Sequence, residues 1–327
     1  MACASRGKAS ATRNLRLSSS GAADCNRVFT PQIAKGKTFP LAVILDALMR
    51  YSQAYRGDTR ERVAVHIKER FGLRISPRTL SQWLAEYREL TTYARLRPAL
   101  LHAFRPHQLI RSTRLHHQQV YHYRIHQGKL ASLLNTPEHQ GFQPIETYLM
   151  EMAASCPHPL FQQEHRASAS ASAFDLTDVE ITEKQNLAPH IAGLILQTVT
   201  HNKRRHDTLQ RFILATDSVT VAIEVPVFLT PDDIDHLQRE LGFTIPFSSE
   251  ATLTGHIDLL QIRNGAIHIL DYKPNAVREK PITQLMVYAL ALSRRTGLRL
   301  YDFVCAWFDE RHYFEFYPLH VVHKRQR

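Results

Sequence analysis

The chain has 327 residues, 44% of them hydrophobic, a length and composition that leave room for two globular domains. Its 41 Lys and Arg against 30 Asp and Glu give a formal charge of +11 at pH 7, which favours an anionic partner such as nucleic acid. The cysteines are scattered without a C-x-x-C pair, which argues against a zinc ribbon. No apolar run approaches the ~20 residues of a membrane span. We therefore expect a cytoplasmic protein without a membrane partner.

The first part of the chain changes character near residue 38. Residues 1–37 are rich in Ser, Ala, Arg and Lys without a sustained apolar period, which predicts a disordered basic arm. From there on, Ile44, Leu48 and Tyr51 recur at helical spacing. We expect an all-α region over residues 38–163.

Two helices within this region have the spacing of a helix-turn-helix. Val63 and Ile67 mark a first helix that Gly72 ends, and Ser76 and Pro77 open a second one as N-cap and first-turn residues. The second helix is expected to bury Leu80, Trp83, Leu84 and Tyr87. Near its N-terminal end it leaves polar side chains that could read base edges in a major groove, namely Arg78, Thr79, Ser81 and Gln82. The alternative is an ordinary helical bundle that binds a protein partner.

Residues 91–165 are interpreted as further helices, with a segment dense in histidine. His116, His117, His122 and His126 suggest a metal site, but the segment lacks acidic ligands, so contact with a nucleic-acid backbone or a plain helix surface is favoured. An Ala/Ser tract follows over residues 164–178 and is predicted to be a linker.

Residues 179–327 are expected to form an α/β domain. The segment from Glu183 to Leu209 predicts helix, and three apolar strands then follow, "SVTVAIEVPVFL", "TGHIDLLQIR" and "AIHILDYKP". A helix from Pro281 to Gly297 and two final strands complete the pattern. This order predicts a mixed sheet flanked by helices.

Charged residues interrupt the second and third of these strands. Asn264-Gly265 predicts a two-residue hairpin in which Asp258 lies opposite Asp271, with Lys273 on the same face. Two adjacent carboxylates repel each other, and a hard cation such as Mg²⁺ or Mn²⁺ would stabilise them. This constellation suits phosphodiester hydrolysis. The alternative is an exposed hairpin edge with a weak surface ion pair.

At these residues the sequence resembles the PD-(D/E)xK nuclease superfamily, and most closely its RecB/Cas4-like branch. "GHID", "ILDYKP" and "QLMVYALAL" carry the resemblance. It implies a restriction-endonuclease-like fold in which Asp258 and Asp271 bind the metal and Lys273 is catalytic. Gln284 and Tyr288, one helical turn apart, would support the site or contact the substrate.

The resemblance also directs attention to residues upstream. Glu224, inside an apolar strand, would act as a supporting acid, and His190 is chosen as a helix-borne metal ligand over Glu183 and His201. Iron–sulfur members of the branch use four flanking cysteines, and a cluster is not expected here. We therefore expect a metal-dependent DNA nuclease positioned by its N-terminal helices. The alternative is a DNA-binding or regulatory protein that does not cleave.

Overall fold

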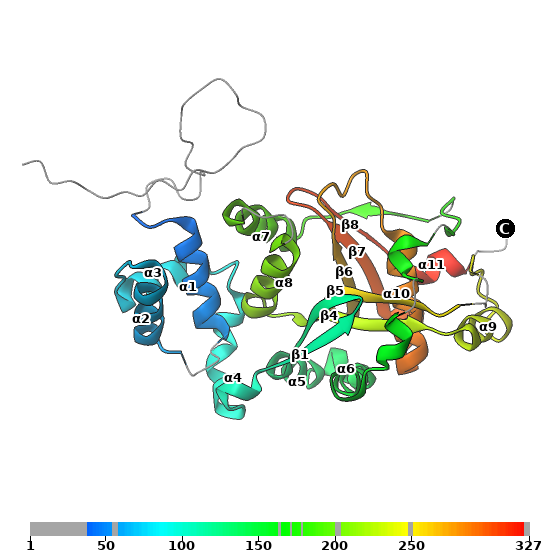
Figure 1. Cartoon of the computed structure of the whole chain (residues 1–327), viewed down its shortest axis with the longest axis horizontal. Helices are drawn as coiled ribbons and strands as arrows, with labels where there is room; N and C mark the ends of the chain where they lie inside the picture. Colours follow the sequence, from blue (N-terminus) through cyan, green and yellow to red (C-terminus); the bar gives the residue numbers. More distant parts are fainter. Residues whose placement is uncertain are drawn as a thin grey trace, which may run out of the picture.

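The computed structural model describes residues 38–53, 58–162, 165–170, 172–177, 179–199, 204–247 and 251–323. The predicted basic arm lies outside these residues. The described chain begins with a group of helices, seen in blue to cyan in Figure 1. They are α1 (Leu41–Gln53), α2 (Arg60–Phe71), α3 (Pro77–Glu86) and α4 (Arg97–Ala103). No helix among the described residues is long and apolar enough to cross a membrane.

The ends of α2 and α3 lie where the sequence predicts them. Gly72 ends α2 in the left-handed conformation at φ 69°, which glycine adopts without strain. The Ser76 hydroxyl accepts a hydrogen bond from the Thr79 N–H at 3.0 Å and so caps α3. Trp83 of α3 is buried, whereas Leu84 is only half-buried. The predicted helix pair is therefore confirmed as a structure.

One eight-stranded mixed sheet organises the rest of the chain, in the order β1-β2-β4-β5-β6-β7-β8-β3. Neighbouring strands are antiparallel except β6 and β7, which are parallel and joined through α10 (Ile282–Thr296). The strands are β1 (Ile110–His117), β2 (Gln119–His126), β3 (Thr182–Glu183), β4 (Thr220–Leu229), β5 (Leu253–Arg263), β6 (Ala266–Tyr272), β7 (Phe303–Phe308) and β8 (Tyr313–Phe316). The predicted mixed sheet flanked by helices is confirmed.

The hairpin β1–β2 corrects the expectation that residues 91–165 are helical throughout. Tyr121, Tyr123 and Ile125 recur every second residue, which is the period of a strand, and β2 pairs with β4 in the main sheet. The interleaved histidines and arginines hide this period in the sequence. The sheet thus includes residues from both sides of the Ala/Ser tract, and within that tract Arg166 pairs with Thr254 of β5.

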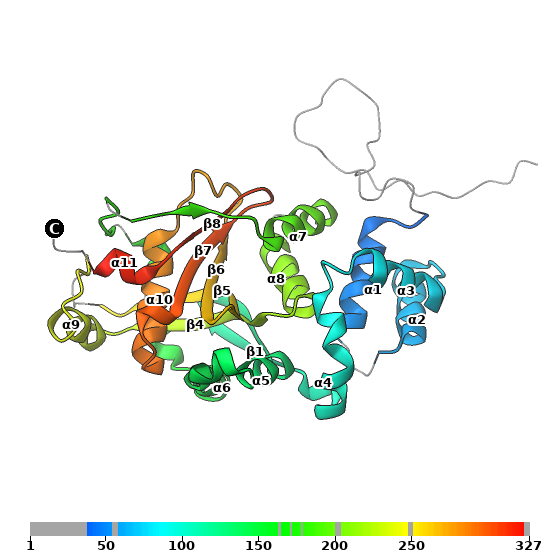
Figure 2. The same cartoon turned by 180° about the vertical axis from the view of Figure 1, so that it is seen from behind.

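Helices cover both faces of the sheet (Figures 1 and 2). On one face lie α5 (Gln127–Leu134), α6 (Gln143–Ser155) and α10, which share a hydrophobic core with the sheet. On the other face lie α7 (Leu187–Ile195) and α8 (Arg205–Thr216), whose core continues into α1. The helix α8 therefore connects the N-terminal helices to the sheet.

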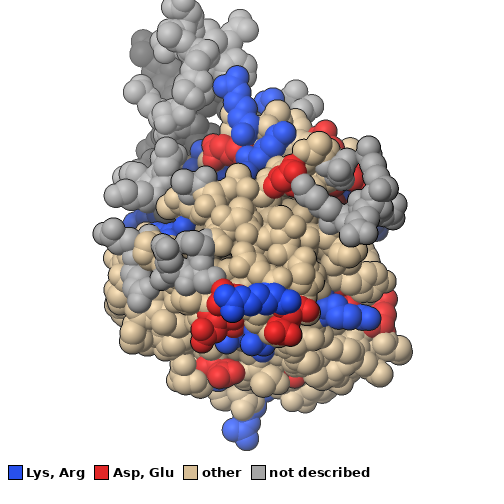
Figure 3. Space-filling view, turned by 90° about the vertical axis from the view of Figure 1, so that its right-hand side faces the viewer, with Lys and Arg blue, Asp and Glu red and all other residues tan. Residues whose placement is uncertain are grey.

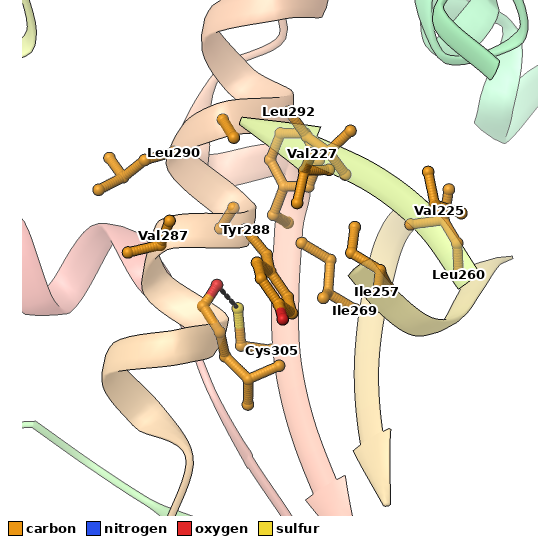
Figure 4. Close-up of a cluster of buried hydrophobic side chains, with 14 of the residues drawn as sticks. Val225, Val227, Ile257, Leu260, Ile269, Val287, Tyr288, Leu290, Leu292 and Cys305 are labelled. Atoms are coloured by element: carbon orange, nitrogen blue, oxygen red, sulfur yellow. Dashed lines mark hydrogen bonds between the residues drawn. The ribbon is translucent and has the colours of Figure 1, made fainter. Parts of the chain in front are cut away.

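The central helix α10 is buried without interruption from Gln284 to Leu292, as expected of a helix enclosed by other elements. Figure 4 shows Tyr288 of this helix directed toward Ile257 and Ile269 of the sheet, whereas Val287 lies on the side of the helix away from them. The Cys305 thiol on β7 donates to the carbonyl of Leu285 at 3.5 Å. This packing fixes the position of α10 against β4, β5 and β7.

The end of the molecule far from the N-terminal helices carries α9 (Pro231–Arg239) and α11 (Pro318–Val322). Figure 3 shows that Lys and Arg lie beside Asp and Glu on this face, on a largely uncharged surface. Asp233, for example, forms ion pairs with Arg294 and Arg295. Charges on this face are thus largely paired with opposite charges.

Candidate active site

A cavity of about 290 Å³ opens where β4, β5, β6 and α10 meet. Every residue for which the sequence predicts a catalytic role lines it. These residues are Glu224, Asp258, Asp271, Lys273, Gln284 and Tyr288.

The hairpin β5–β6 brings two of the carboxylates to the cavity. The predicted register holds from the Arg263–Ala266 pair to the Leu259–Leu270 pair. Beyond it, β5 stays paired with β4 and β6 with β7, so the two strands of the hairpin separate. The Asp258 carboxylate lies in this gap and accepts the Tyr272 N–H at 3.0 Å.

Asp271 is held by two side chains from different directions. Its Oδ1 accepts a hydrogen bond from Gln284 at 2.9 Å, and the Lys273 ammonium lies 2.8 Å from Oδ2. Apart from this ion pair, the buried Oδ2 has no hydrogen-bond partner among the described residues. Gln284 also donates to the Tyr288 hydroxyl at 3.0 Å, which links α10 to the carboxylate.

Glu224 joins this pair from β4. Its strand neighbours pair with residues 257 and 259, which places Glu224 level with Asp258. Its backbone has φ 53°, a left-handed conformation that is rare for a residue with a Cβ. Such strain is found most often at functional sites, because the surrounding structure must compensate for it.

Two of the carboxylates, Glu224 and Asp271, have a raised proton affinity. Burial, and then the neighbouring Asp258, raise the pKa of Glu224 to about 8 and the pKa of Asp271 to about 7. Burial alone would lower the pKa of Lys273, but the Asp271 carboxylate outweighs it and the net pKa is raised. The cavity therefore favours positive charge.

A hard divalent cation fits this group of residues. Carboxylate oxygens are the ligands that Mg²⁺ and Mn²⁺ prefer, and Oδ2 of Asp271, which has the Lys273 ion pair but no hydrogen bond from the described residues, is a buried acceptor of this kind. A cation here would neutralise the negative charge that otherwise raises the pKa of Glu224 and Asp271.

The structure does not bring His190 to the cavity. His190 is exposed on α7, Glu183 is exposed on β3, and His201 lies outside the described residues. Instead, His206 at the start of α8 places its Nδ1 3.6 Å from the Asp258 carboxylate, which raises the pKa of His206. The sequence predicts helix from Glu183 to Leu209, but the chain forms two helices, α7 and α8. The second, α8, directly precedes β4, so it brings His206 to the cavity, whereas His190 lies on α7.

One turn further along α8, Gln210 also contacts the site. Its Nε2 donates to Oδ1 of Asp258 at 3.1 Å, and its buried Oε1 has no hydrogen-bond partner among the described residues. The spacing of His206 and Gln210, four residues apart in "RHDTLQRF", is the signal that could have identified both.

Gly255 on β5 makes room for the Tyr288 ring. A Cβ at this position would lie 2.3 Å from Cε1 and 2.7 Å from the hydroxyl oxygen of Tyr288. The motif "GHID" therefore supplies both a ligand-type carboxylate and the space for its supporting tyrosine.

The other wall of the cavity is formed by Tyr121 and His256, for which the sequence predicts no role, and by His117, one of the histidines for which nucleic-acid contact or a helix surface is favoured over a metal site. The structure places His117 at the end of β1, where it is 1% exposed. The sequence favours a helix surface as one location for this histidine, and the structure corrects this expectation.

On α3, Arg78 and Gln82 are exposed, whereas Thr79 and Ser81 are half-buried. Thr79 contacts the cap residue Ser76, and the Ser81 hydroxyl donates to the Pro77 carbonyl at 3.1 Å. Of the residues predicted to contact DNA, Arg78 and Gln82 are thus the most accessible.

A family model for the PD-(D/E)XK nuclease superfamily matches residues 152–308. This range contains Glu224, the hairpin β5–β6 and all of β7, and so covers the whole carboxylate group. No curated protein sequence and no solved structure gives a significant match to the chain.

Proposed function

From the premise that the C-terminal half of the chain, over residues 152–308, is a domain of the PD-(D/E)XK nuclease superfamily, we propose that this protein is a metal-dependent DNA nuclease. The observation that carries the proposal is the convergence of Asp258, Asp271 and Lys273 in one cavity. Two carboxylates from neighbouring strands and one ammonium suit metal-assisted phosphodiester hydrolysis, because they can bind a divalent cation and stabilise the developing negative charge.

Asp258 and Asp271 would hold Mg²⁺ or Mn²⁺, with Glu224 as a supporting acid and His206 beside Asp258 in the place expected for His190. When bound, such an ion polarises a phosphoryl oxygen and lowers the pKa of a bound water. Gln210 and the Tyr272 N–H orient the Asp258 carboxylate from two sides.

Lys273 acts as a cation in this proposal. Its raised pKa keeps the ammonium protonated at neutral pH, so it can donate to an attacking water or to a phosphate oxygen as negative charge develops. Its Nζ lies 3.3 Å from Oε1 of Gln284, and the same Gln284 holds Asp271. One amide thus positions both charged groups.

The N-terminal helices would position the enzyme on duplex DNA through α3. Replacing Arg78 and Gln82 with alanine should weaken DNA binding and, if Arg78 contacts a phosphate, reduce the salt dependence of binding by about one unit of slope. Arg239→Ala on α9, a similarly exposed arginine at the far end of the molecule, is the control. Unchanged affinity in the α3 variants would favour a protein partner for these helices.

The test of the proposed activity is incubation of the full chain with labelled linear and circular DNA in Mg²⁺, Mn²⁺ or EDTA. Cleavage is expected with metal only, and is expected to disappear in Asp271→Ala. Cutting of the circle would identify an endonuclease.

The competing function is DNA binding without cleavage. The intact set of Asp258, Asp271 and Lys273 opposes it, because a binding module has no need for buried carboxylates that repel each other. DNA that is bound but stays whole with every metal would establish this alternative.

A further inference from the structure

A second group of metal-type side chains lies beside the carboxylates and has no role in the proposed cleavage. It consists of His117 at the end of β1, Cys156 at the end of α6 and His158, two residues further on. One ligand atom from each residue lies within 4.8 Å of the others. We propose that these three residues bind Zn²⁺ in a site distinct from the carboxylate site.

The distances fit a zinc ion. Nε2 of His117 lies 2.9 Å from Nδ1 of His158 and 3.8 Å from Sγ of Cys156. In a tetrahedral site with Zn–N near 2.0–2.1 Å and Zn–S near 2.3 Å, neighbouring ligand atoms lie roughly 3.3–3.6 Å apart. The two distances from His117 differ from these values by a few tenths of an ångström, and Sγ of Cys156 and the ligand nitrogen of His158 lie within 4.8 Å of each other.

A tight turn brings two of the ligands together. The His158 N–H donates to the Cys156 carbonyl at 2.8 Å across Pro157, so both side chains emerge from a three-residue turn. Phe161 stacks on the His117 ring at 4.1 Å and holds it against this turn.

The remaining nitrogen of His117 has the partner that a ligating histidine requires. Its Nδ1 lies 2.8 Å from Nε2 of His256, whose ring stacks on Tyr121 at 3.5 Å. If Nδ1 donates to His256, the lone pair on Nε2 points to the other two ligands. Second-shell hydrogen bonds of this kind fix the tautomer and orientation of a metal-bound imidazole.

The ligand types select a softer ion than the carboxylate site does. A thiolate with two imidazoles suits Zn²⁺, whereas Mg²⁺ prefers oxygen ligands. His158 is exposed, which gives the ion access and leaves a fourth position for water or another donor.

The site would act as a structural clip beside the cavity. His256 lies two residues before Asp258, on the same face of β5, and both line the cavity. Zinc would therefore tie β1 and the end of α6, through His256, to the strand that carries Asp258.

The first experiment measures zinc content and affinity in the full chain without an affinity tag. We expect about one Zn²⁺ per chain, and Co²⁺ bound to the zinc-stripped protein should show a thiolate charge-transfer band. Cys156→Ser should abolish that band, and His158→Ala should weaken Zn²⁺ binding by about tenfold or more. Because His158 is exposed, its replacement should preserve the fold, which circular dichroism checks.

Two controls separate this site from its surroundings. His116→Ala replaces the exposed neighbour of His117 and should keep the zinc. Asp271→Asn should also keep it while losing cleavage, so failure of the nuclease proposal would not affect the result. Absence of zinc from the wild type would overturn the proposal. So would a zinc content in Cys156→Ser and His158→Ala that equals that of the wild type. Either result would leave His117, His158 and His256 as a metal-free chain of hydrogen-bonded histidines.

Discussion

Two of the places where the described residues bury charged side chains balance those charges differently. In the first, Lys129 is fully buried, donates to the Leu214 carbonyl at 2.6 Å and lies 3.1 Å from Asp217. Asp217 in turn accepts the Thr220 N–H at 2.9 Å as well as the Thr220 hydroxyl. One cation faces one anion, and both have hydrogen-bond partners.

In the cavity, the carboxylates of Glu224, Asp258 and Asp271 face Lys273 and the partly exposed His206. The pKa of two of the three acids is raised as a result, and one buried oxygen of Asp271 accepts no hydrogen bond from the described residues. The comparison teaches that burial of charge alone does not mark a functional site. A buried group with excess negative charge does mark such a site, because it needs a bound cation to balance that charge.

The largest expected difference between the two places is in activity. Asp271→Asn should reduce metal-dependent cleavage to background, since it removes a proposed ligand. Metal-free stability at pH 8 should be kept or raised, because the change removes a carboxylate whose ionisation is disfavoured. Cleavage assays and urea unfolding of the same preparations measure both effects. Cleavage near the wild-type rate would remove Asp271 from the mechanism.

The balanced pair should behave in the opposite way. Asp217→Asn leaves the buried Lys129 ammonium without its counterion and should lower the free energy of unfolding by about 3–5 kcal/mol. Cleavage per folded molecule should be unchanged below the unfolding transition. A stable variant that has lost activity would contradict the division into structural and functional charges.

The raised pKa values of Glu224 and Asp271 predict a pH effect on stability. A group with a higher pKa in the folded chain stabilises the fold at low pH, and this contribution is lost as the pH rises through about 7 and 8. In EDTA, the free energy of unfolding should fall on the order of 4 kcal/mol from about pH 6 to about pH 8.5, since each group contributes about 1.4 kcal/mol per pH unit below its folded pKa.

Denaturant titrations across this pH range measure the effect. Mg²⁺ should reduce the loss of stability, because a cation takes the place of the protons. Glu224→Gln should also reduce it, whereas Asp217→Asn should not. A pH profile that Mg²⁺ leaves unchanged would argue against cation binding by these acids.

A smaller effect is expected at Gly255. Gly255→Ala would push the Tyr288 ring away and disturb the Gln284 amide that holds Asp271, so cleavage should fall about ten- to a hundredfold with the fold retained. Gly193→Ala on α7, where a Cβ meets its nearest atom at 3.6 Å, is the matched control. Equal activity in both variants would show that the position of Tyr288 does not matter.

The parts of the fold that follow from local chemistry were predictable. Asn264-Gly265 determines the hairpin register, Gly72 and Ser76 mark the ends of α2 and α3, and Gly297 ends α10. These signals act within a few residues. For the same reason, the approach of Asp258 to the strand that carries Asp271 could be worked out before any tertiary contact was known, although the hairpin pairing itself ends at Leu259–Leu270.

The parts that depend on tertiary contacts were not predictable. His206 reaches the cavity only because α7 and α8 are separate helices, and the strand period of β2 is hidden by its histidines and arginines. The left-handed φ of Glu224 and the space above Gly255 have no sequence signal of their own. Long-range packing determines both.

The most direct test of the central claim measures Mn²⁺ binding to the full chain by electron paramagnetic resonance. The wild type and Asp217→Asn should bind the ion, as should Cys156→Ser, in which the proposed zinc site is disrupted. Asp271→Asn should bind it far more weakly. If the wild type binds no Mn²⁺, or if Asp271→Asn binds it equally well, the unbalanced carboxylates are not a metal site and the account is contradicted.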